Sequence, residues 1–216
     1  GSFTAQAFIT TDLDDNQITA FHPGAMTYSH LNRVTDAQDA TLGIVAPDGR
    51  DGMLQHAQDL EAAGVPFVFD PGQGLPMFSG EELLGFMRLA NYACFNDYEA
   101  KLLCDRTGRS LEQLATEVQA LIVTLGGAGS RILADGRCHE IPCVQAEAVV
   151  DPTGCGDAYR SGLLYGIAAG WDWEKVGRLA AVMGAIKIAH RGGQNHRPGR
   201  ADISDLFAKA FGTNLW

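Results

Sequence analysis

The sequence predicts an α/β fold in which helices cover both faces of a mainly parallel sheet. From about residue 40 onward, short apolar segments of strand length alternate with stretches of helical periodicity. The last third of the chain carries long helical patterns. The chain has 216 residues, of which 46% are hydrophobic, so it can form one large or two small domains with a sizeable core.

The opening part of the chain follows a different pattern. Residues 3–11 and 17–22 are rich in β-branched and aromatic residues, and an acidic cluster of Asp12, Asp14 and Asp15 separates them. Because short acidic residues favour turns, we expect a hairpin here. We interpret the acidic cluster as a solvated loop tip in preference to a metal site.

The elements after the hairpin can be assigned in order. The expected strands are residues 42–46, 65–69, 92–95 and 121–124, followed by a closing hairpin of residues 131–134 and 137–141 around Asp135-Gly136. A helix is predicted by the spacing of Met53, Leu54, Ala57 and Leu60, and another by the capped start Ser79-Gly-Glu-Glu82. Two more helices carry their apolar faces on Tyr159, Leu163, Gly166 and Ile167, and on Val176, Leu179, Ala180 and Met183.

The composition excludes several classes of function. Lys and Arg number 16 against 26 Asp and Glu, a formal net charge of -10, so we expect no binding to nucleic acid or to anionic membranes. No apolar stretch approaches the roughly 20 residues that span a bilayer. The five cysteines form no CxxC pair, which favours a reducing, cytoplasmic location. There is also no GxxxxGK[S/T], HExxH or GxSxG motif.

The segment Asp151-Pro-Thr-Gly-Cys-Gly-Asp157 carries the most chemical information. Its glycines precede a predicted long helix, so the N–H groups of Gly154, Cys155 and Gly156 can point at one spot, where the helix dipole favours an anion. Asp157 then falls in the first helical turn, where a base could meet a substrate hydroxyl. The alternative is a tight turn followed by a carboxylate that only compensates the dipole.

Three segments together indicate a family. The string Asp151-Pro-Thr-Gly-Cys-Gly-Asp-Ala-Tyr-Arg-Ser-Gly162 resembles the carboxyl-terminal signature of the PfkB (ribokinase-like) carbohydrate and nucleoside kinases. Asn96-Asp-Tyr-Glu99 resembles the family's N-x-x-E motif, and Thr124-Leu-Gly-Gly-Ala-Gly129 resembles its nucleotide loop. With Phe69-Asp-Pro, the set is most similar to bacterial adenosine kinases and related nucleoside kinases.

The resemblance implies a ribokinase-like three-layer sandwich with a mainly parallel sheet. Residues 1–39 would be the remnant of a β-rich substrate lid with its connection, and residues 40–216 the ATP-binding α/β core. Family members begin with a further segment that supplies the first strands, an acidic residue for sugar hydroxyls and a Gly-Gly…Asn motif. We therefore expect this chain to be a carboxyl-terminal fragment that favours association, as a homodimer or with a partner supplying the missing piece.

The resemblance also implies roles for the phosphoryl-transfer residues. Asp157 would be the general base, and the N–H groups of Gly154, Cys155 and Gly156 would hold the charge on the transferred phosphoryl. Asn96 and Glu99 would organise phosphate and Mg²⁺, with Glu99 acting through water. A capping box, with Asn in place of Ser or Thr, explains the same spacing.

Further residues are implied to bind ATP, a monovalent cation and the acceptor. Thr124, Gly126, Gly127 and Gly129 would approach the nucleotide, or simply form a strand-to-hairpin turn; Gly192 would lie near adenine, or cap a helix. Asp151 and Thr153 would hold K⁺, or form only a turn. Phe8 and Phe21 would stack on a purine, or pack in the core. Arg160 would reach phosphate or acceptor, or form a surface salt bridge.

The function expected from these residues is ATP-dependent phosphorylation of the 5′-hydroxyl of a purine nucleoside, as in an adenosine kinase. A ribokinase-like sugar kinase is an alternative, since the acceptor contacts lie largely in the segment expected to be missing. A non-catalytic nucleotide-binding fragment is another. The partner in each case is a small molecule.

Overall fold

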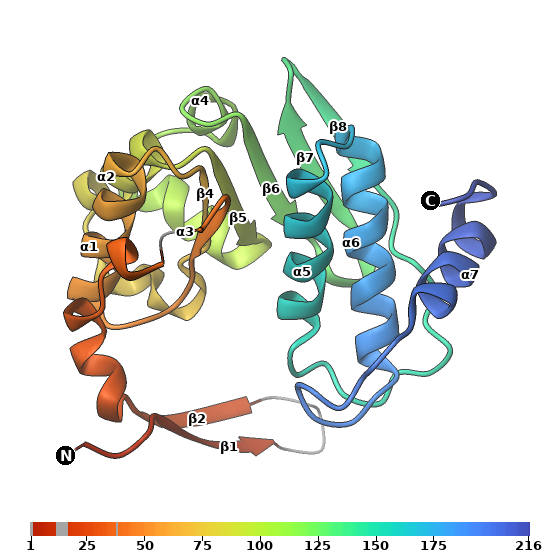
Figure 1. Cartoon of the computed structure of the whole chain (residues 1–216), viewed down its shortest axis with the longest axis horizontal. Helices are drawn as coiled ribbons and strands as arrows, with labels where there is room; N and C mark the ends of the chain where they lie inside the picture. The colour runs from red at the N-terminus through yellow and green to blue at the C-terminus, as the bar shows by residue number, and fades with distance from the viewer. Residues whose placement is uncertain (1, 12–16, 38) are drawn as a thin grey trace.

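A six-stranded sheet with strand order β3-β4-β5-β6-β7-β8 runs through the centre of the molecule (Figure 1). The computed structural model describes residues 2–11, 17–37 and 39–216. Strands β3 to β6 are parallel, and β7 and β8 continue the sheet antiparallel, as the sequence predicts. Their bounds are β3 Gly43–Val45, β4 Phe67–Phe69, β5 Tyr92–Asn96, β6 Ala120–Thr124, β7 Ser130–Ala134 and β8 Arg137–Ile141.

Helices cover both faces of this sheet (Figure 1). One face packs against α1 (Arg50–Ala62), α2 (Gly80–Leu89) and α3 (Asp97–Thr107), and the short α4 (Leu111–Ala115) adds to this layer. The other face packs against α5 (Cys155–Ala168) and α6 (Trp173–Ile188). Helix α7 (Arg200–Phe211) lies outside α6 and was not predicted, although Ile203, Leu206 and Phe207 carry helical spacing.

The apolar character of the strands follows from this double coverage. In β4, Phe67 and Phe69 face the layer of α1 to α3, while Val68 between them faces α5 and α6. Phe69 stacks on Phe86 of α2, with ring centroids 4.4 Å apart. Because side chains alternate between two buried faces, a strand of a parallel sheet reads as a continuous apolar run.

The opening segment forms the predicted hairpin, which projects from the body of the molecule (Figure 1). Strand β1 (Gln6–Thr11) pairs antiparallel with β2 (Gln17–His22). The predicted turn with Asp12, Asp14 and Asp15 lies outside the described residues. Two 3₁₀ segments follow, η1 (Gly24–Leu31) and η2 (Val34–Asp36).

An ion pair fastens this connection to the core. Arg33 donates from Nε and Nη2 to the two carboxylate oxygens of Asp59 in α1, at 2.7 Å each. The hydrogen bond from Arg33 lowers the pKa of Asp59 to about 2. Asp59 therefore stays ionised over the ordinary pH range and holds the segment that leads into the sheet.

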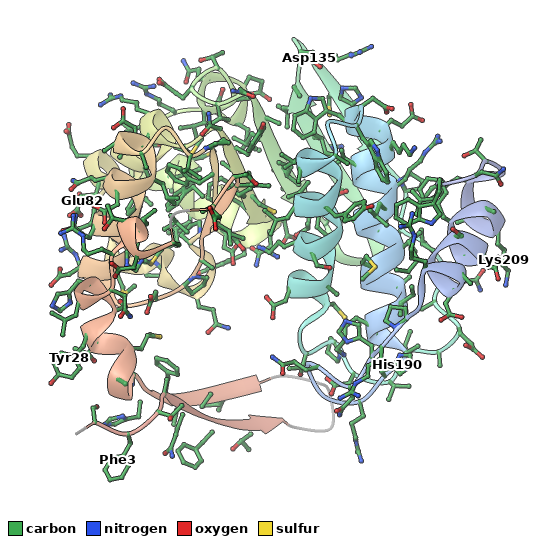
Figure 2. The ribbon with its side chains drawn as sticks, in the orientation of Figure 1. Phe3, Tyr28, Glu82, Asp135, His190 and Lys209 are labelled. Carbon is green, nitrogen blue, oxygen red and sulfur yellow. The ribbon has the colours of Figure 1, made fainter. Side chains whose placement is uncertain are left out.

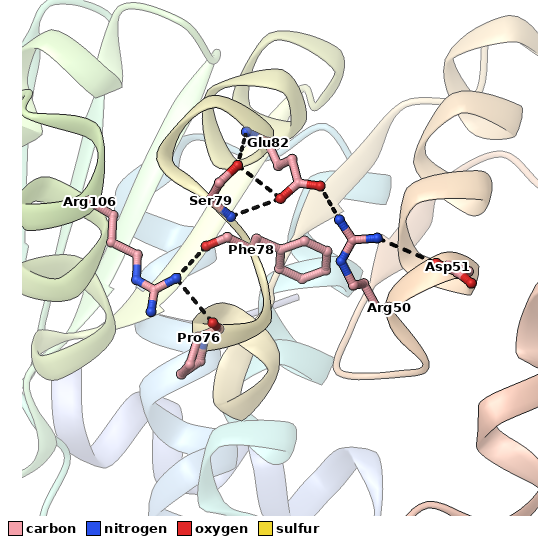
Figure 3. A network of polar contacts seen from close by, with 7 residues as sticks. All are labelled: Arg50, Asp51, Pro76, Phe78, Ser79, Glu82 and Arg106. Carbon is pink, nitrogen blue, oxygen red and sulfur yellow. Dashed lines mark hydrogen bonds and ion pairs between the residues drawn. The ribbon is translucent and has the colours of Figure 1, made fainter.

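The predicted start of α2 is held by polar contacts on two sides (Figure 3). Ser79 accepts from the N–H of Glu82 at 3.3 Å, and Glu82 accepts from the N–H of Ser79 at 2.8 Å, which completes the capping box. Arg50 of α1 pairs with Glu82. Arg106 of α3 donates to the carbonyl of Pro76 at 3.0 Å, so both neighbouring helices fix the entry to α2.

Helices α5 and α6 approach each other closely through glycine. A Cβ added at Gly162 would lie 2.7 Å from Cα of Ala180, and one at Gly166 would lie 3.1 Å from Cα of Val176. These close approaches hold α5, which follows the Asp151–Gly154 loop, against α6. Across the residues that the structure describes, no helix combines the length and the apolar character needed to cross a membrane.

This packing predicts opposite effects for two glycine-to-alanine substitutions inside helices. Gly162→Ala forces α5 and α6 apart and should lower the free energy of unfolding by about 1–3 kcal/mol. Gly85→Ala in α2 meets no atom within 4 Å and should raise it by about 0.5–1 kcal/mol. Urea denaturation of both variants tests this, and equal changes in stability would contradict the close packing of α5 on α6.

Candidate active site

The candidate site lies at the carboxyl edge of the parallel strands. Asp70 follows β4, Asn96 ends β5, and Thr124 ends β6. Asn96 and Thr124 are direct partners in the β5–β6 register. The N-x-x-E motif and the glycine loop of residues 124–129 therefore begin side by side. In open α/β sheets, ligands bind at this edge.

Asn96 and Glu99 form a complete capping box at the start of α3. The N–H of Asn96 donates to Glu99 Oε2 at 2.8 Å, its Nδ2 donates to Oε1 at 3.0 Å, and the N–H of Glu99 donates to Asn96 Oδ1 at 2.7 Å. Glu99 is 8% exposed, and burial raises the pKa of its carboxyl group. The capping alternative is therefore confirmed, and it presents one carboxylate at the sheet edge.

The glycine loop separates into two parts with different reasons for glycine. A Cβ at Gly129 would lie 2.1 Å from the carbonyl oxygen of Ile141, and Gly129 has φ 92°, so packing and backbone conformation require glycine there. A Cβ at Gly126 or Gly127, in η4 (Gly126–Ala128), would meet no atom within 4 Å, but Gly126 has φ 55°, a conformation that favours glycine. Thr124 donates from Oγ1 to the carbonyl of Phe95 at 3.4 Å. The turn interpretation thus suffices for Gly129 and explains the glycine at position 126, while Gly126 and Gly127 both border open space.

The signature loop leads into α5 through a left-handed residue. Gly154 has φ 80° at the N-cap, and a Cβ there would lie 3.1 Å from the carbonyl oxygen of Gly193. The N–H of Cys155 donates to the carbonyl of Pro152 at 3.1 Å, a bond that the sequence did not predict. Among the described residues, the N–H groups of Gly156 and Asp157 have no main-chain acceptor, so they remain available at the positive end of the α5 dipole.

Asp157 lies in the first turn of α5 with its side chain exposed. It is not enclosed in apolar packing, and it stands beside the free amides of the same turn. A carboxylate in this position can accept a proton from a bound hydroxyl group.

A buried ion pair joins this turn to the sheet. Arg160, one turn further along α5, donates from Nη2 to Asp70 Oδ1 at 2.6 Å, and its Nε faces Asp70 Oδ2. The side chains are only 13% and 5% exposed. Burial raises the pKa of Asp70, the Arg160 guanidinium lowers it, and the carboxylate of Asp157 lies close enough to raise it further. The surface salt bridge considered for Arg160 is wrong, because its partner is an internal carboxylate.

The same guanidinium also lies against Gly156. A Cβ at Gly156 would lie 2.7 Å from Arg160 Nη1. Sequence reasoning missed the role of Asp70, although Phe69-Asp-Pro is one of the segments that carry the family resemblance. The available signal was an acidic residue directly after a buried strand.

Asp151 is held by main-chain donors on both sides. Its Oδ2 accepts from the N–H of Gly192 at 2.7 Å, and its Oδ1 accepts from the N–H of Thr153 at 2.9 Å. These bonds lower the pKa of Asp151 to about 2, with Gly192 as the largest cause. Gly192 does not cap α6, since the helix ends at Ile188 with Ala189 as its C-cap; the N–H of Gly192 holds the Asp151 side chain instead.

Phe8 and Phe21 are exposed, at 65% and 53%, so the core-packing interpretation is wrong for both. The hairpin register pairs Phe8 with Ala20 and Ala7 with Phe21. Directly opposite residues share a face and successive residues alternate, so the two phenylalanines lie on opposite faces of the hairpin. One face of this hairpin can therefore present only one of them to a ligand.

No group of three or more His, Cys, Asp or Glu side chains that could hold a metal ion occurs in the described ranges 2–11, 17–37 and 39–216. The carboxylate of Asp70 nevertheless interacts electrostatically with those of Glu99 and Asp157. The Arg160 guanidinium interacts with Asp70 and Glu99. A single carboxylate with waters fits Mg²⁺, which dehydrates reluctantly.

Comparison with known proteins identifies the family. A family model described as pfkB family carbohydrate kinase matches residues 3–200. The chain belongs to the pfkB family of carbohydrate kinases. This result confirms the resemblance on which the residue roles are based.

Two similar proteins, one compared by sequence and one by structure, are nucleoside kinases. The nucleoside kinase of Methanocaldococcus jannaschii is 36% identical over 197 residues, which are 90% of this chain and 64% of that protein. A structure of the Burkholderia thailandensis nucleoside kinase in complex with inosine matches with a TM-score of 0.96 and 57% identity, over 99% of this chain and 70% of that chain. This chain thus spans about two thirds of their length.

A more distant structure agrees on the fold. The ribokinase of Thermotoga maritima matches with a TM-score of 0.79 at 21% identity, over 96% of this chain. The predicted ribokinase-like α/β fold is confirmed.

The buried pair predicts a large stability loss when one partner is removed. Arg160→Met leaves the Asp70 carboxylate buried without its partner and should cost about 3–5 kcal/mol of unfolding free energy. Lys101→Met is the matched control: it breaks the exposed Lys101–Asp105 pair, with side chains 76% and 59% exposed, and should cost less than about 1 kcal/mol.

The double variant Asp70→Asn with Arg160→Met sharpens this test, because it removes both charges. It should be more stable than Arg160→Met alone in urea denaturation. Equal losses for Arg160→Met and Lys101→Met would show that the internal pair does not hold α5 to the sheet.

Proposed function

We propose that the protein is an ATP-dependent kinase that phosphorylates the 5′-hydroxyl group of a purine nucleoside. The observation that carries the proposal is the first turn of α5, where the exposed carboxylate of Asp157 stands beside free main-chain amides at the carboxyl edge of the sheet. The proposal concerns the whole protein, because the relatives it is based on are longer than this chain.

A nucleoside acceptor is supported by the relatives. The Burkholderia thailandensis nucleoside kinase, 57% identical, has been solved with inosine and with ADP-inosine. Inosine is a purine nucleoside, and ADP is what remains of ATP after its terminal phosphoryl group is transferred. A sugar acceptor has weaker support, since the ribokinase of Thermotoga maritima matches at only 21% identity.

In this proposal, Asp157 accepts the proton of the attacking hydroxyl. The N–H groups of Gly154 and Gly156 hold the negative charge of the transferred phosphoryl group, and the N–H of Asp157 adds to them. The N–H of Cys155 contributes less than the sequence suggested, because it already donates to Pro152. Phosphoryl transfer depends mainly on positioning and charge stabilisation, which this turn can supply.

We assign the nucleotide to the neighbouring strand ends. Thr124, Gly126 and Gly127 border open space beside Asn96 and suit close approach of ATP. Glu99 would hold Mg²⁺ through water, and this ion neutralises phosphate oxygens when bound. Such neutralisation is needed because Asp70, Glu99 and Asp157 outnumber Arg160 at this edge.

The hairpin and its connection, residues 1–39, are assigned to a lid over the nucleoside, and residues 40–216 to the ATP-binding core. Either Phe8 or Phe21, on the hairpin face that turns toward the acceptor, would stack on the purine. Arg160 acts by holding α5 and Asp70 in place, so its proposed part is positioning. Self-association and cytoplasmic location stay predictions.

The role of Asp157 can be tested by substitution. Asp157→Asn should lower kcat by about 10²–10⁴-fold while leaving the affinity for ADP unchanged, because it removes the base and keeps the amides. Product formation is followed by chromatography with inosine, adenosine, guanosine, ribose and fructose as acceptors. The assay uses this chain and a version extended by the amino-terminal segment that the family pattern predicts.

Asp51→Asn is the matched control. Asp51 is also an exposed acidic residue in the first turn of a helix, α1, so it shares any dipole effect but not the site. Its kcat should equal that of the parent. Equal kcat for Asp157→Asn and the parent would refute the base, ADP binding without turnover would favour a nucleotide-binding module, and faster turnover with ribose would favour a sugar kinase.

A further inference from the structure

Lys187, in the last turn of α6, is a buried cation that the proposed reaction does not use. Its side chain is completely buried, at 0% exposure. Nζ donates to the carbonyl of Asp151 at 2.8 Å and to the carbonyl of His190 at 2.9 Å. His190 lies at the turn after α6, beside the loop that leads into α5 (Figure 2).

The surroundings of Nζ are those of a cation site built from main-chain oxygens. Lysine is almost never fully buried unless it is paired. Within the described part of the chain, no carboxylate oxygen forms an ion pair with Lys187. Its charge is stabilised by two carbonyl oxygens at the negative end of the α6 dipole and, at longer range, by the Asp151 carboxylate.

These contacts do not fit the K⁺ site that the sequence suggested at Asp151 and Thr153. Both carboxylate oxygens of Asp151 accept N–H groups, from Gly192 and Thr153. The carbonyls of Asp151 and His190, which a cation between the two segments would need, already accept from Lys187. The Asp151 oxygens and the His190 carbonyl thus already accept hydrogen bonds from the protein itself.

Lys187 joins the loop that begins at Asp151 and leads into α5 to the turn at His190 that follows α6. The N–H groups of Val150 and Asp151 donate to the carbonyl of Ile188, at 2.9 and 3.1 Å. Gly154 lies against Gly193. A positive charge between residues 151 and 190 therefore fixes the start of the segment whose end presents the amides of Gly156 and Asp157.

We propose that the Lys187 ammonium group is a built-in monovalent cation, which positions the Asp151–Asp157 loop so that the protein needs no K⁺. Lys187 is a positioning residue, since Nζ contacts only main-chain carbonyls. Measurements of ADP binding rest on the nucleotide site proposed above. Thermal stability provides a second readout that does not depend on that site.

The first test uses the unmodified chain in KCl, NaCl and tetramethylammonium chloride at equal ionic strength. Tm and the Kd for ADP should be the same in all three salts, since no alkali cation enters the site. A higher Tm or tighter ADP binding in KCl alone would overturn the proposal. If ADP does not bind in any salt, the proposed function fails, and the Tm comparison still decides this one.

The second test removes the ammonium group of Lys187 by two substitutions. Alanine leaves a cavity at the position of the lysine side chain, and methionine fills it. In tetramethylammonium chloride, Lys187→Ala and Lys187→Met should both lower Tm and weaken ADP binding by about tenfold or more, the scale of a lost charged hydrogen bond. KCl or ammonium chloride should restore Lys187→Ala, which leaves a hole for the cation. Lys187→Met should not be restored, because its side chain fills that hole.

An unchanged response of Lys187→Ala to the three salts, together with a normal ADP affinity, would overturn the proposal. So would equal rescue of the Ala and Met variants, since rescue would then not depend on an open site. If neither variant folds, the comparison of salts on the unmodified chain decides the outcome.

Discussion

The position of the candidate site depends on the buried ion pair between Asp70 and Arg160. Asp70 directly follows β4 and Arg160 lies one turn into α5, 90 residues later in the chain. The pair therefore sets where the first turn of α5 meets the carboxyl edge of the sheet. The Arg160 guanidinium also lies against Gly156, where a Cβ would lie 2.7 Å from Nη1. An anion site made of main-chain amides needs this kind of fixed backbone, because it has no flexible side chain to adjust.

A second cation holds the other end of the same segment. Lys187 binds the carbonyl of Asp151, while the Asp151 carboxylate accepts from Gly192. The signature loop is thus fastened at its start by contacts to the turn after α6 and at its end by contacts to the sheet. Both cations are hydrogen-bond donors, so neither occupies the N–H groups of Gly156 and Asp157, which have no main-chain acceptor in the described part of the chain.

Much of the fold could be predicted from the sequence because its signals are local. Strand length, helical spacing and the capping boxes at Ser79 and Asn96 all depend on residues a few positions apart. The long-range pairs could not be predicted in this way. Lys187 resembles any basic residue near a helix carboxyl end, and only the arrangement of α6 beside residue 151 reveals that it is buried. The sequence predicts that Phe8 and Phe21 both stack on a purine, yet the strand register places them on opposite faces of the hairpin.

Binding of nucleotide phosphate at the first turn of α5 is the feature on which the proposed reaction depends. Titration of ¹⁵N-labelled protein with ADP, followed by amide chemical shifts, tests it most directly. The largest shifts are expected at Gly154, Gly156 and Asp157, with further shifts at Gly126 and Gly127. Saturable shifts confined to residues remote from these five amides would contradict the account.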